Sequence, residues 1–419
     1  HFSERPLPNA SLLEMAAAYR EWAWQVDAAA LEALRIAQNS PQTADLTAVK
    51  AAVRAIYKPW LEKTASQFQQ SVQASGYPYQ PLPPLRPGTC LLFSDALRMD
   101  CAHSLAARLV EAGLQVHLDG TWAALPPVTS TSKPAFSPDQ NLLSGQPSRS
   151  LNPTLAGRES PLTADSFRNI LREQGFQILI GDDLGENPSG LGWTELGQID
   201  TYGHQHGVKL ALHLENEIQN LASRIRSLLA HGWARVQVVS DHGWLLLPGS
   251  LPKAHLPEST AEQRKGRCAR LKPGSQSNLF SLPWHWDSSV AIAYAPGIQC
   301  FEAGKEYEHG GLSLQECFTP VLTVQASGES VQVSISEIKW RGLRCQVTLS
   351  APLPGLQVDL RTRPADASTS LLATPKAIDE TGQASLVVAD DDLLGAAAVL
   401  VVLNADGALC AQSPTLVGG

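Results

Sequence analysis

The sequence predicts an α/β protein with a mostly parallel central sheet, preceded by a helical module and followed by a small β-sandwich. Two observations predict this class. Between residues 88 and 324 short apolar runs alternate with helical segments, and after residue 324 the runs become closely spaced with period-two alternation. Strands that alternate with helices are typical of βαβ units and a parallel sheet. At 419 residues the chain is long enough for two or three domains.

The first domain is a predicted helical module with its linker, over residues 1–87. Apolar side chains recur at helical spacing within residues 11–74, with little β-branched alternation. The stretch 76–88 (GYPYQPLPPLRPG) is rich in proline and cannot continue a helix. We therefore expect a new domain to begin at residue 88.

Residues 88–324 are predicted to form the catalytic domain. Its apolar runs are CLLFSD from residue 90, LQVHLDG from 114, FQILIG from 176, ARVQVVSD from 234 and SSVAIAYAP from 288. In a parallel sheet, ligands bind beyond the carboxyl ends of the strands. Asp95 and Asp241 each follow an apolar run and one serine, so both are expected at that edge.

Residues 325–419 are predicted to form a small immunoglobulin-like β-sandwich. The runs are VQVSISEI, LRCQVTLS, LQVDLRT, ASLVVAD and AAVLVVLN, separated by turn residues. Short period-two strands at this spacing favour a sandwich. Nothing in this part of the sequence indicates catalysis.

The composition narrows the class of protein. The net charge is -8, with 43% hydrophobic and 17% charged residues, and no apolar run approaches a membrane span. A negative net charge disfavours a protein that binds nucleic acid over its whole surface. Seven scattered cysteines without a Cys-x-x-Cys pair favour reduced thiols in the cytoplasm. The chain starts at His1 without a leader, and we expect the natural protein to be longer.

Three short motifs and one later histidine carry the residues expected to do chemistry. They are SDALRMD from Ser94, DTYGHQHG from Asp200, SDHGW from Ser240 and HGG at His309. Taken singly, an aspartate after a strand is commonly a helix cap, and Asp200 with His204 could be an ordinary ion pair. Together, three carboxylates and three imidazoles are enough for two three-ligand metal sites with open positions.

This ordered set resembles the alkaline phosphatase superfamily, especially its phosphodiesterase branch. The resemblance covers about residues 88–324 and implies an alkaline-phosphatase-like core. Within that superfamily, VTSTSKPAFSP from residue 128 and HGGLSLQECFTP from residue 309 resemble PglZ proteins of the bacterial BREX phage-defence systems. The resemblance implies a metal-dependent hydrolase of phosphate esters or diesters, and a nuclease is one form that this activity could take.

The resemblance also implies which residues hold two divalent metals. One metal would be held beside the nucleophile by Asp95, Asp241 and His242. The other would be held by Asp200, His204 and His309. Mixed nitrogen and oxygen ligands favour zinc, with manganese as the alternative.

A threonine is the implied nucleophile, in the segment that starts at Val128. The phosphodiesterase pattern aligns best with Thr129, and Thr131 stays open because proline replaces the first threonine of the pattern. The threonine oxygen would attack phosphorus in line, and water would then hydrolyse the phosphoenzyme. Lys133 and Arg98 are expected to neutralise charge on the phosphoryl oxygens, or else to be surface or ion-pair residues.

A basic segment, RKGRCARLK from Arg264, stands out in this acidic chain. Lys265, Arg267 and Arg270 are candidate contacts to the phosphate backbone of DNA, and a solvated loop is the alternative. The expected partners are a phosphate-containing substrate and other BREX proteins, without a membrane; the oligomeric state stays open. A metal-stabilised scaffold that docks BREX components with little turnover is the competing function.

Overall fold

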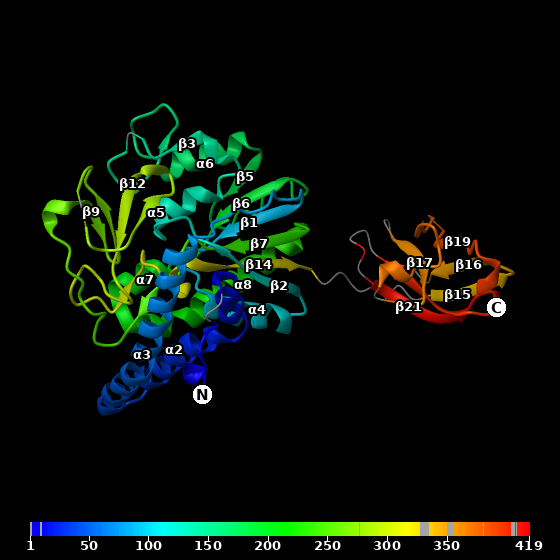
Figure 1. Cartoon of the computed structure of the whole chain (residues 1–419), viewed down its shortest axis with the longest axis horizontal. Coiled ribbons are helices and arrows are strands. Elements are labelled where there is room, and N and C mark those ends of the chain that lie inside the picture. Colours follow the sequence, from blue (N-terminus) through cyan, green and yellow to red (C-terminus); the bar gives the residue numbers. More distant parts are fainter. Residues whose placement is uncertain are drawn as a thin grey trace. The chain divides into compact units, whose positions relative to one another are not determined.

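The computed structural model describes residues 2–8, 11–146, 148–275, 277–326, 335–349, 356–364, 366–379, 381–403, 407 and 409–419. The chain divides into two compact units, residues 1–326 and 327–419 (Figure 1). The predicted class is confirmed: helices come first, a mostly parallel sheet follows, and a small two-sheet β structure ends the chain. None of the helices in the described ranges is long and apolar enough to cross a bilayer.

The first unit begins with helices, as the periodicity predicts. They are α1 (Leu12–Ala18), the π-helical turn η2 (Tyr19–Ala23), α2 (Trp24–Gln38) and α3 (Thr43–Ser75). The proline-rich stretch that follows forms no helix or strand up to residue 86. These helices share one hydrophobic core with the sheet, because Met15, Leu34 and Phe68 belong to the same buried cluster as Leu92 and Val238.

A six-stranded sheet forms the centre of this unit, in the order β2-β14-β7-β1-β6-β5. Its strands are β1 (Thr89–Phe93), β2 (Gln115–Trp122), β5 (Phe176–Leu179), β6 (Leu191–Glu195), β7 (Arg235–Val239) and β14 (Phe318–Gln325). Four neighbouring strands are parallel, and β14 runs antiparallel to both of its neighbours. Figure 1 shows the strands stacked in this order, from β5 at the top to β2.

Helices cover both faces of the sheet. They are α4 (Met99–Glu111), α6 (Ala164–Glu173), α7 (Ile199–His206), α8 (Leu210–His231) and the short α5 (Thr129–Ser132) and α9 (Leu314–Cys317). Alternate residues of β1 face opposite layers: Leu92 packs in the cluster of α4 and α8, whereas Leu91 and Phe93 pack with Phe167 of α6. The sheet is therefore buried on both faces, as parallel sheets require.

One run forms the strand that was predicted, but in a different sheet. The run SSVAIAYAP forms β12 (Asp287–Tyr294), which lies in a separate antiparallel sheet with β9 (Ala261–Lys265), β10 (Cys268–Leu271) and β11 (Ser281–Trp284). The central sheet contains instead the parallel strand β6 and the antiparallel strand β14, which the sequence reading did not identify. A buried apolar run has the same periodicity in either kind of sheet, so the pattern could not separate them.

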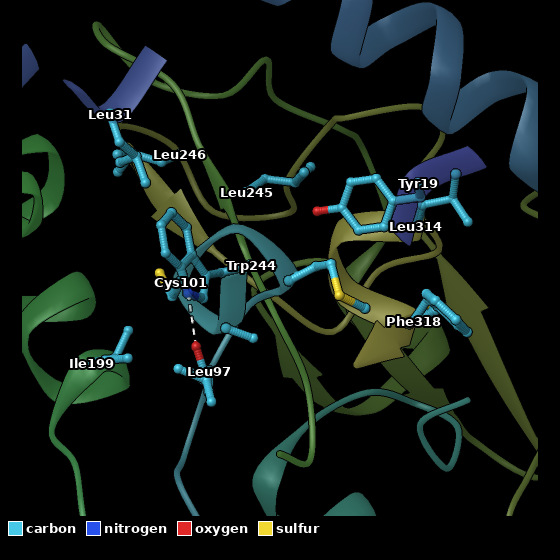
Figure 2. Close-up of a cluster of buried hydrophobic side chains, with 14 of the residues drawn as sticks. Tyr19, Leu31, Leu97, Cys101, Ile199, Trp244, Leu245, Leu246, Leu314 and Phe318 are labelled. Atoms are coloured by element: carbon cyan, nitrogen blue, oxygen red, sulfur yellow. Dashed lines mark hydrogen bonds between the residues drawn. The ribbon is translucent and has the colours of Figure 1, made fainter. Parts of the chain in front are cut away.

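Part of this same hydrophobic core packs the turns that follow β1 and β7 against the helices (Figure 2). Trp244 lies at its centre and donates its indole N–H to the carbonyl oxygen of Ala96, at 3.0 Å. Leu97 and Leu245 belong to the same buried cluster. The turns that follow β1 and β7 are thus fixed from beneath by apolar packing.

The second unit contains two antiparallel sheets. One is formed by β15 (Ile335–Arg341), β16 (Arg344–Leu349) and β19 (Gln383–Val387), and the other by β17 (Gln357–Arg361), β18 (Lys376–Ala377), β20 (Ala397–Leu403) and β21 (Leu409–Leu416). Each predicted run forms a strand, although residues 331–334 of the first run lie outside the described residues. The inward side chains of both sheets form one core that includes Val347, Leu360 and Leu400.

Candidate metal centre and active site

The turns after β1 and β7 bring two of the predicted aspartates to one edge of the sheet. The two strands pair in parallel, with Phe93 opposite Val239. The Ser94 N–H donates to the carbonyl oxygen of Val239 at 2.9 Å, and the Leu97 N–H donates to Oγ of Ser240 at 2.8 Å. These bonds tie the turn that carries Asp95 to the turn that carries Asp241.

His242 points one ring nitrogen at both aspartates. Its Nδ1 lies 3.0 Å from the carbonyl oxygen of Gly243, so this nitrogen carries the proton that it donates. Its Nε2 lies 3.5 Å from Oδ1 of Asp95 and 3.7 Å from Oδ2 of Asp241. The hydroxyl of Thr129 is 3.1 Å from the same Nε2. The imidazole is therefore held in the orientation that a metal-ligating histidine needs.

A second group of predicted ligands gathers around Asp200. This residue lies in the first turn of α7, with His204 one turn later, and Nε2 of His204 is 3.5 Å from Oδ1 of Asp200. His309 follows β13 (Tyr307–Glu308), and its Nε2 is also 3.5 Å from that oxygen. Its Nδ1 lies 3.1 Å from the carbonyl oxygen of Pro127, which again leaves Nε2 for a ligand.

Five of the six predicted ligands fall into two sets of neighbouring donor atoms, and Asp241 belongs to neither set. The rings of His242 and His309 stack at 3.8 Å between centroids with an angle of 4°. Two sets have donor atoms within 4.8 Å of one another: Asp200 with His204 and His309, and Asp95 with Asp200 and His242. Asp200 thus belongs to both sets, whereas the prediction assigned it to one.

The buried carboxylates fit a bound cation. Oδ1 of Asp95 and Oδ2 of Asp241 are buried without a hydrogen-bond partner. Buried carboxylate oxygens normally have a donor or a cation beside them, because an unpaired buried charge is costly. A mixed set of carboxylates and imidazoles is the donor chemistry that zinc and manganese use. The residues present therefore fit two divalent metals.

The pKa values express the same excess of negative charge. Burial, followed by the charge of Asp241, raises the pKa of Asp95 to about 8. Burial lowers the pKa of His242, but Asp241, Asp95 and Asp200 outweigh it and raise that pKa to about 9. Burial and the neighbouring His242 lower the pKa of His309 to about 3.

Two motif glycines have a steric reason. A Cβ on Gly203 would lie 2.3 Å from the ring of Tyr307, so the aromatic ring can pack against α7 only where glycine stands. A Cβ on Gly243 would lie 1.9 Å from the carbonyl oxygen of Gln315. Both glycines thus permit the close approach that brings the ligand-bearing segments together.

The two candidate threonines lie in different surroundings. Thr129 is half-buried at the start of α5, with its hydroxyl at His242. Thr131 is fully buried and donates its hydroxyl to the carbonyl oxygen of Leu151 at 2.9 Å, and it accepts the indole N–H of Trp284 at 3.0 Å. The hydroxyl of Thr131 is therefore occupied within the core, and Thr129 faces the candidate ligands.

Lys133 lies one helical turn after Thr129 and borders a cavity of about 370 Å³. The same cavity is lined by Asp95, Glu195 and Gln198, among others. The ammonium group of Lys133 is 2.6 Å from Oε2 of Glu195. Lys133 thus places a positive charge next to the candidate metal ligands, paired with a carboxylate that the sequence reading did not single out.

The prediction that Arg98 contacts phosphate was wrong. Its side chain is buried, and it donates from Nε and Nη2 to both carboxylate oxygens of Asp100, at 2.7 and 2.9 Å. A third nitrogen donates to the carbonyl oxygen of Trp244, whose ring lies 3.6 Å from the guanidinium carbon. The guanidinium is occupied inside the protein and does not reach the site.

The basic segment is a β-hairpin of β9 and β10, not a loop, and two of its three candidate contacts were wrong. Arg267 is fully buried and pairs with Glu316 at 2.8 Å. Arg270 is almost fully buried and pairs with Glu262 at 2.9 Å. Lys265 is exposed, so its contact with phosphate stays a prediction.

Two site residues had no signal in the sequence. Tyr307 donates its hydroxyl to Oδ1 of Asp200 at 2.9 Å. Glu308 lies with one oxygen 3.9 Å from Nδ1 of His204, and burial raises its pKa to about 7. Both lie on β13, the short strand that pairs with β8 (Leu245–Leu246) and leads into His309.

Comparison with known proteins gives distant structural matches only. No family model and no curated protein matches the chain. Murine ectonucleotide pyrophosphatase/phosphodiesterase 5 matches with a TM-score of 0.37 and 11% identity, over 57% of this chain and 87% of that one. An inactive variant of the murine protein in complex with AMP gives 0.38, 9%, 57% and 88%, and the human protein gives 0.38, 11%, 57% and 87%. Similarity at this level supports no statement about substrate or activity.

Proposed function

We propose that this protein hydrolyses phosphate esters or diesters with two divalent metals, zinc first, and with Thr129 as the nucleophile. One observation carries the proposal: the hydroxyl of Thr129 lies 3.1 Å from Nε2 of His242, beside two buried carboxylate oxygens that have no hydrogen-bond partner. A hydroxyl next to a site that demands cations is the arrangement that a phosphoryl-transfer nucleophile requires.

The chain's own residues divide into two holding sets and one nucleophile. Asp95, Asp241 and His242 would hold the cation next to Thr129. Asp200, His204 and His309 would hold the other, and Asp200 is near enough to serve both. When bound, the cations would supply positive charge that attracts phosphate and lowers the pKa of a nearby hydroxyl.

The reaction at Thr129 would be an in-line displacement. The threonine hydroxyl gives up its proton to solvent, and its oxygen forms a bond to phosphorus while the ester P–O bond breaks. The leaving oxygen takes up a proton from solvent and departs as the alcohol. Water then cleaves the phosphothreonine, which restores the hydroxyl and releases phosphate or a phosphate monoester. Lys133, one turn from Thr129, would stabilise the negative phosphoryl oxygens.

The cavity beside Asp95 would take the ester group. Its volume of about 370 Å³ suits a small molecule, and its lining is polar, with Glu195, Gln198 and Asn220 along it. We favour the ester of a small polar alcohol over a DNA strand as substrate. Arg267 and Arg270 are used up in internal ion pairs, which leaves the hairpin little positive charge for a phosphate backbone.

A role in BREX phage defence, in the cytoplasm and beside other BREX proteins, belongs to the same proposal. It rests on the resemblance of the segments from residues 128 and 309 to PglZ proteins. The first of these segments contains Thr129 and Lys133, and the second begins with His309. The resemblance thus concerns the residues on which the proposed chemistry depends.

Thr129→Ala tests the nucleophile. In the zinc-loaded protein we expect kcat for bis(p-nitrophenyl) phosphate to fall on the order of 10³-fold or more, because no other hydroxyl takes its place. Bound zinc, measured by mass spectrometry, should stay at the wild-type level, since the ligands come from other segments. Thr131→Val is the matched control and should keep most of the rate. A near-normal rate in Thr129→Ala would exclude this nucleophile.

A further inference from the structure

Arg267, expected at the surface, is wholly buried next to the segment that carries His309. Its Nε lies 2.8 Å from Oε1 of Glu316, and both side chains are fully buried. Its other nitrogens donate to the carbonyl oxygens of Gln299 at 2.5 Å and Gly297 at 2.9 Å. Three acceptors therefore fix the guanidinium in one position.

Glu316 connects Arg267 to the segment that carries His309. The oxygen that pairs with Arg267 also accepts the backbone N–H of Gly311 at 2.7 Å, two residues after His309. Its second oxygen accepts the hydroxyl of Ser313 at 2.6 Å. A Cβ on Gly311 would lie 2.5 Å from Nε of Arg267, so the chain passes directly over the guanidinium.

The backbone of Glu316 reaches the other histidine loop as well. Its carbonyl oxygen accepts the N–H of Gly243 at 3.1 Å, and Gly243 directly follows His242. One residue thus bonds to the two segments that carry His242 and His309, whose rings stack at 3.8 Å. Each of these histidines belongs to a different candidate ligand set.

We propose that the Arg267–Glu316 pair is a positioning device that sets the two stacked imidazoles, and through them both metal positions. The pair does not touch substrate or the reacting atoms. It would act as the outer residues of metal sites do, by fixing the direction of first ligands, and loss of such residues typically costs about 10- to 100-fold in metal affinity. This inference rests on the proposed metal centre for its affinity measurement.

The test compares Arg267→Lys with Arg270→Lys in the full chain. Both substitutions weaken an arginine–carboxylate pair in the β9–β10 hairpin: Arg267 lies in its turn and Arg270 on β10. Arg270, however, contacts Glu262 and the carbonyl oxygens of Ser148 and Ser150 instead of the segments that carry His242 and His309. Zinc titration by calorimetry should show a 10- to 100-fold loss for Arg267→Lys at both positions and none for Arg270→Lys. Equal zinc affinity in folded Arg267→Lys and wild type would overturn the inference.

Two further measurements keep the outcome decisive. If Arg267→Lys does not fold, Glu316→Gln keeps the shape of the side chain while it removes the charge, and we expect the same direction of change. The imidazole NMR signals of His242 and His309 in metal-free protein provide a readout independent of metal. We expect them to shift in Arg267→Lys and to stay in place in Arg270→Lys. Unmoved signals would overturn the inference whether or not the wild type binds zinc. Absence of zinc binding by the wild type would count only against the proposed function.

Discussion

Two groups of buried or half-buried carboxylates are neutralised in different ways, although Asp95 of one group and Asp100 of the other stand on the same short segment of the chain. The first is the metal-site group, Asp95, Asp200 and Asp241. The second is a helix-side group in which Asp27 and Asp100 surround Arg98. Asp100 receives two hydrogen bonds from Arg98, and Asp27 receives the hydroxyls of Tyr19, at 2.8 Å, and Tyr57. In the metal-site group, by contrast, Asp95 and Asp241 each keep a buried oxygen without a donor.

The difference separates a structural use of buried charge from a functional one. The helix-side group brings its own cation and donors, so each of its carboxylates has a hydrogen-bond partner when the chain folds. The metal-site group is incomplete without an external cation and stays costly until one binds. Removal of a carboxylate from the metal-site group should therefore lower activity, whereas removal from the helix-side group should lower the free energy of unfolding.

The largest effect is expected at Asp241. Asp241→Asn keeps the shape but removes the charge, so bound metal and hydrolysis should both be lost, with a fall in rate on the order of 10³-fold or more. With EDTA present, the free energy of unfolding should stay at or above that of the wild type, because a buried charge without a partner is gone. Activity assays and urea unfolding in EDTA measure the two sides. Full activity in this variant would break the comparison.

A stability effect without a metal effect is expected at Asp100. Asp100→Asn leaves the buried guanidinium of Arg98 without its ion-pair partner, which should cost about 3–5 kcal/mol of unfolding free energy. The loss should be the same with and without EDTA, because Asp100 is not a candidate ligand. Urea unfolding under both conditions checks this. If the cost appeared only in the metal-loaded protein, the two groups would not be separate.

The pH dependence of stability should sharpen the comparison further. Burial raises the pKa of Asp27 to about 6, although Arg98 opposes the rise. A carboxyl with a raised folded pKa binds its proton more tightly in the native state. Its contribution is therefore fully present below pH 4 and is lost as pH rises through about 6, by roughly 3 kcal/mol. Asp27→Asn should flatten that part of the curve of unfolding free energy against pH. An unchanged slope between pH 4 and 7 would contradict it.

Much of the site was predictable because its ligands stand in short motifs at strand ends. Asp95 and Asp241 each follow a buried strand. Parallel strands of one sheet end at the same edge, so the motifs alone predicted that both carboxylates lie at that edge. Asp200 and His204 are one helical turn apart, which needs no tertiary information. His309 converges with them through the short pairing of β13 and β8, which periodicity does not reveal.

The basic residues were mispredicted for the opposite reason. Whether an arginine is a surface cation or a buried partner depends on which carboxylate the fold brings to it. Glu316 lies 49 residues from Arg267 in sequence, and nothing local to the segment indicates the pairing. The segment contains five positively charged residues, and the folded hairpin buries two of them, Arg267 and Arg270.

The helix-side group also decides what can fold by itself. Asp27 belongs to α2 and Tyr57 to α3, while Arg98 and Asp100 stand at the start of α4, after the proline-rich stretch. A shortened protein that began at residue 88 would expose the Arg98–Asp100 pair to water and strip the apolar cover from the turns below the ligands. We therefore expect the whole first unit to be the smallest part that folds by itself: the N-terminal helices form the apolar support beneath the candidate metal centre, so a protein without them should not fold.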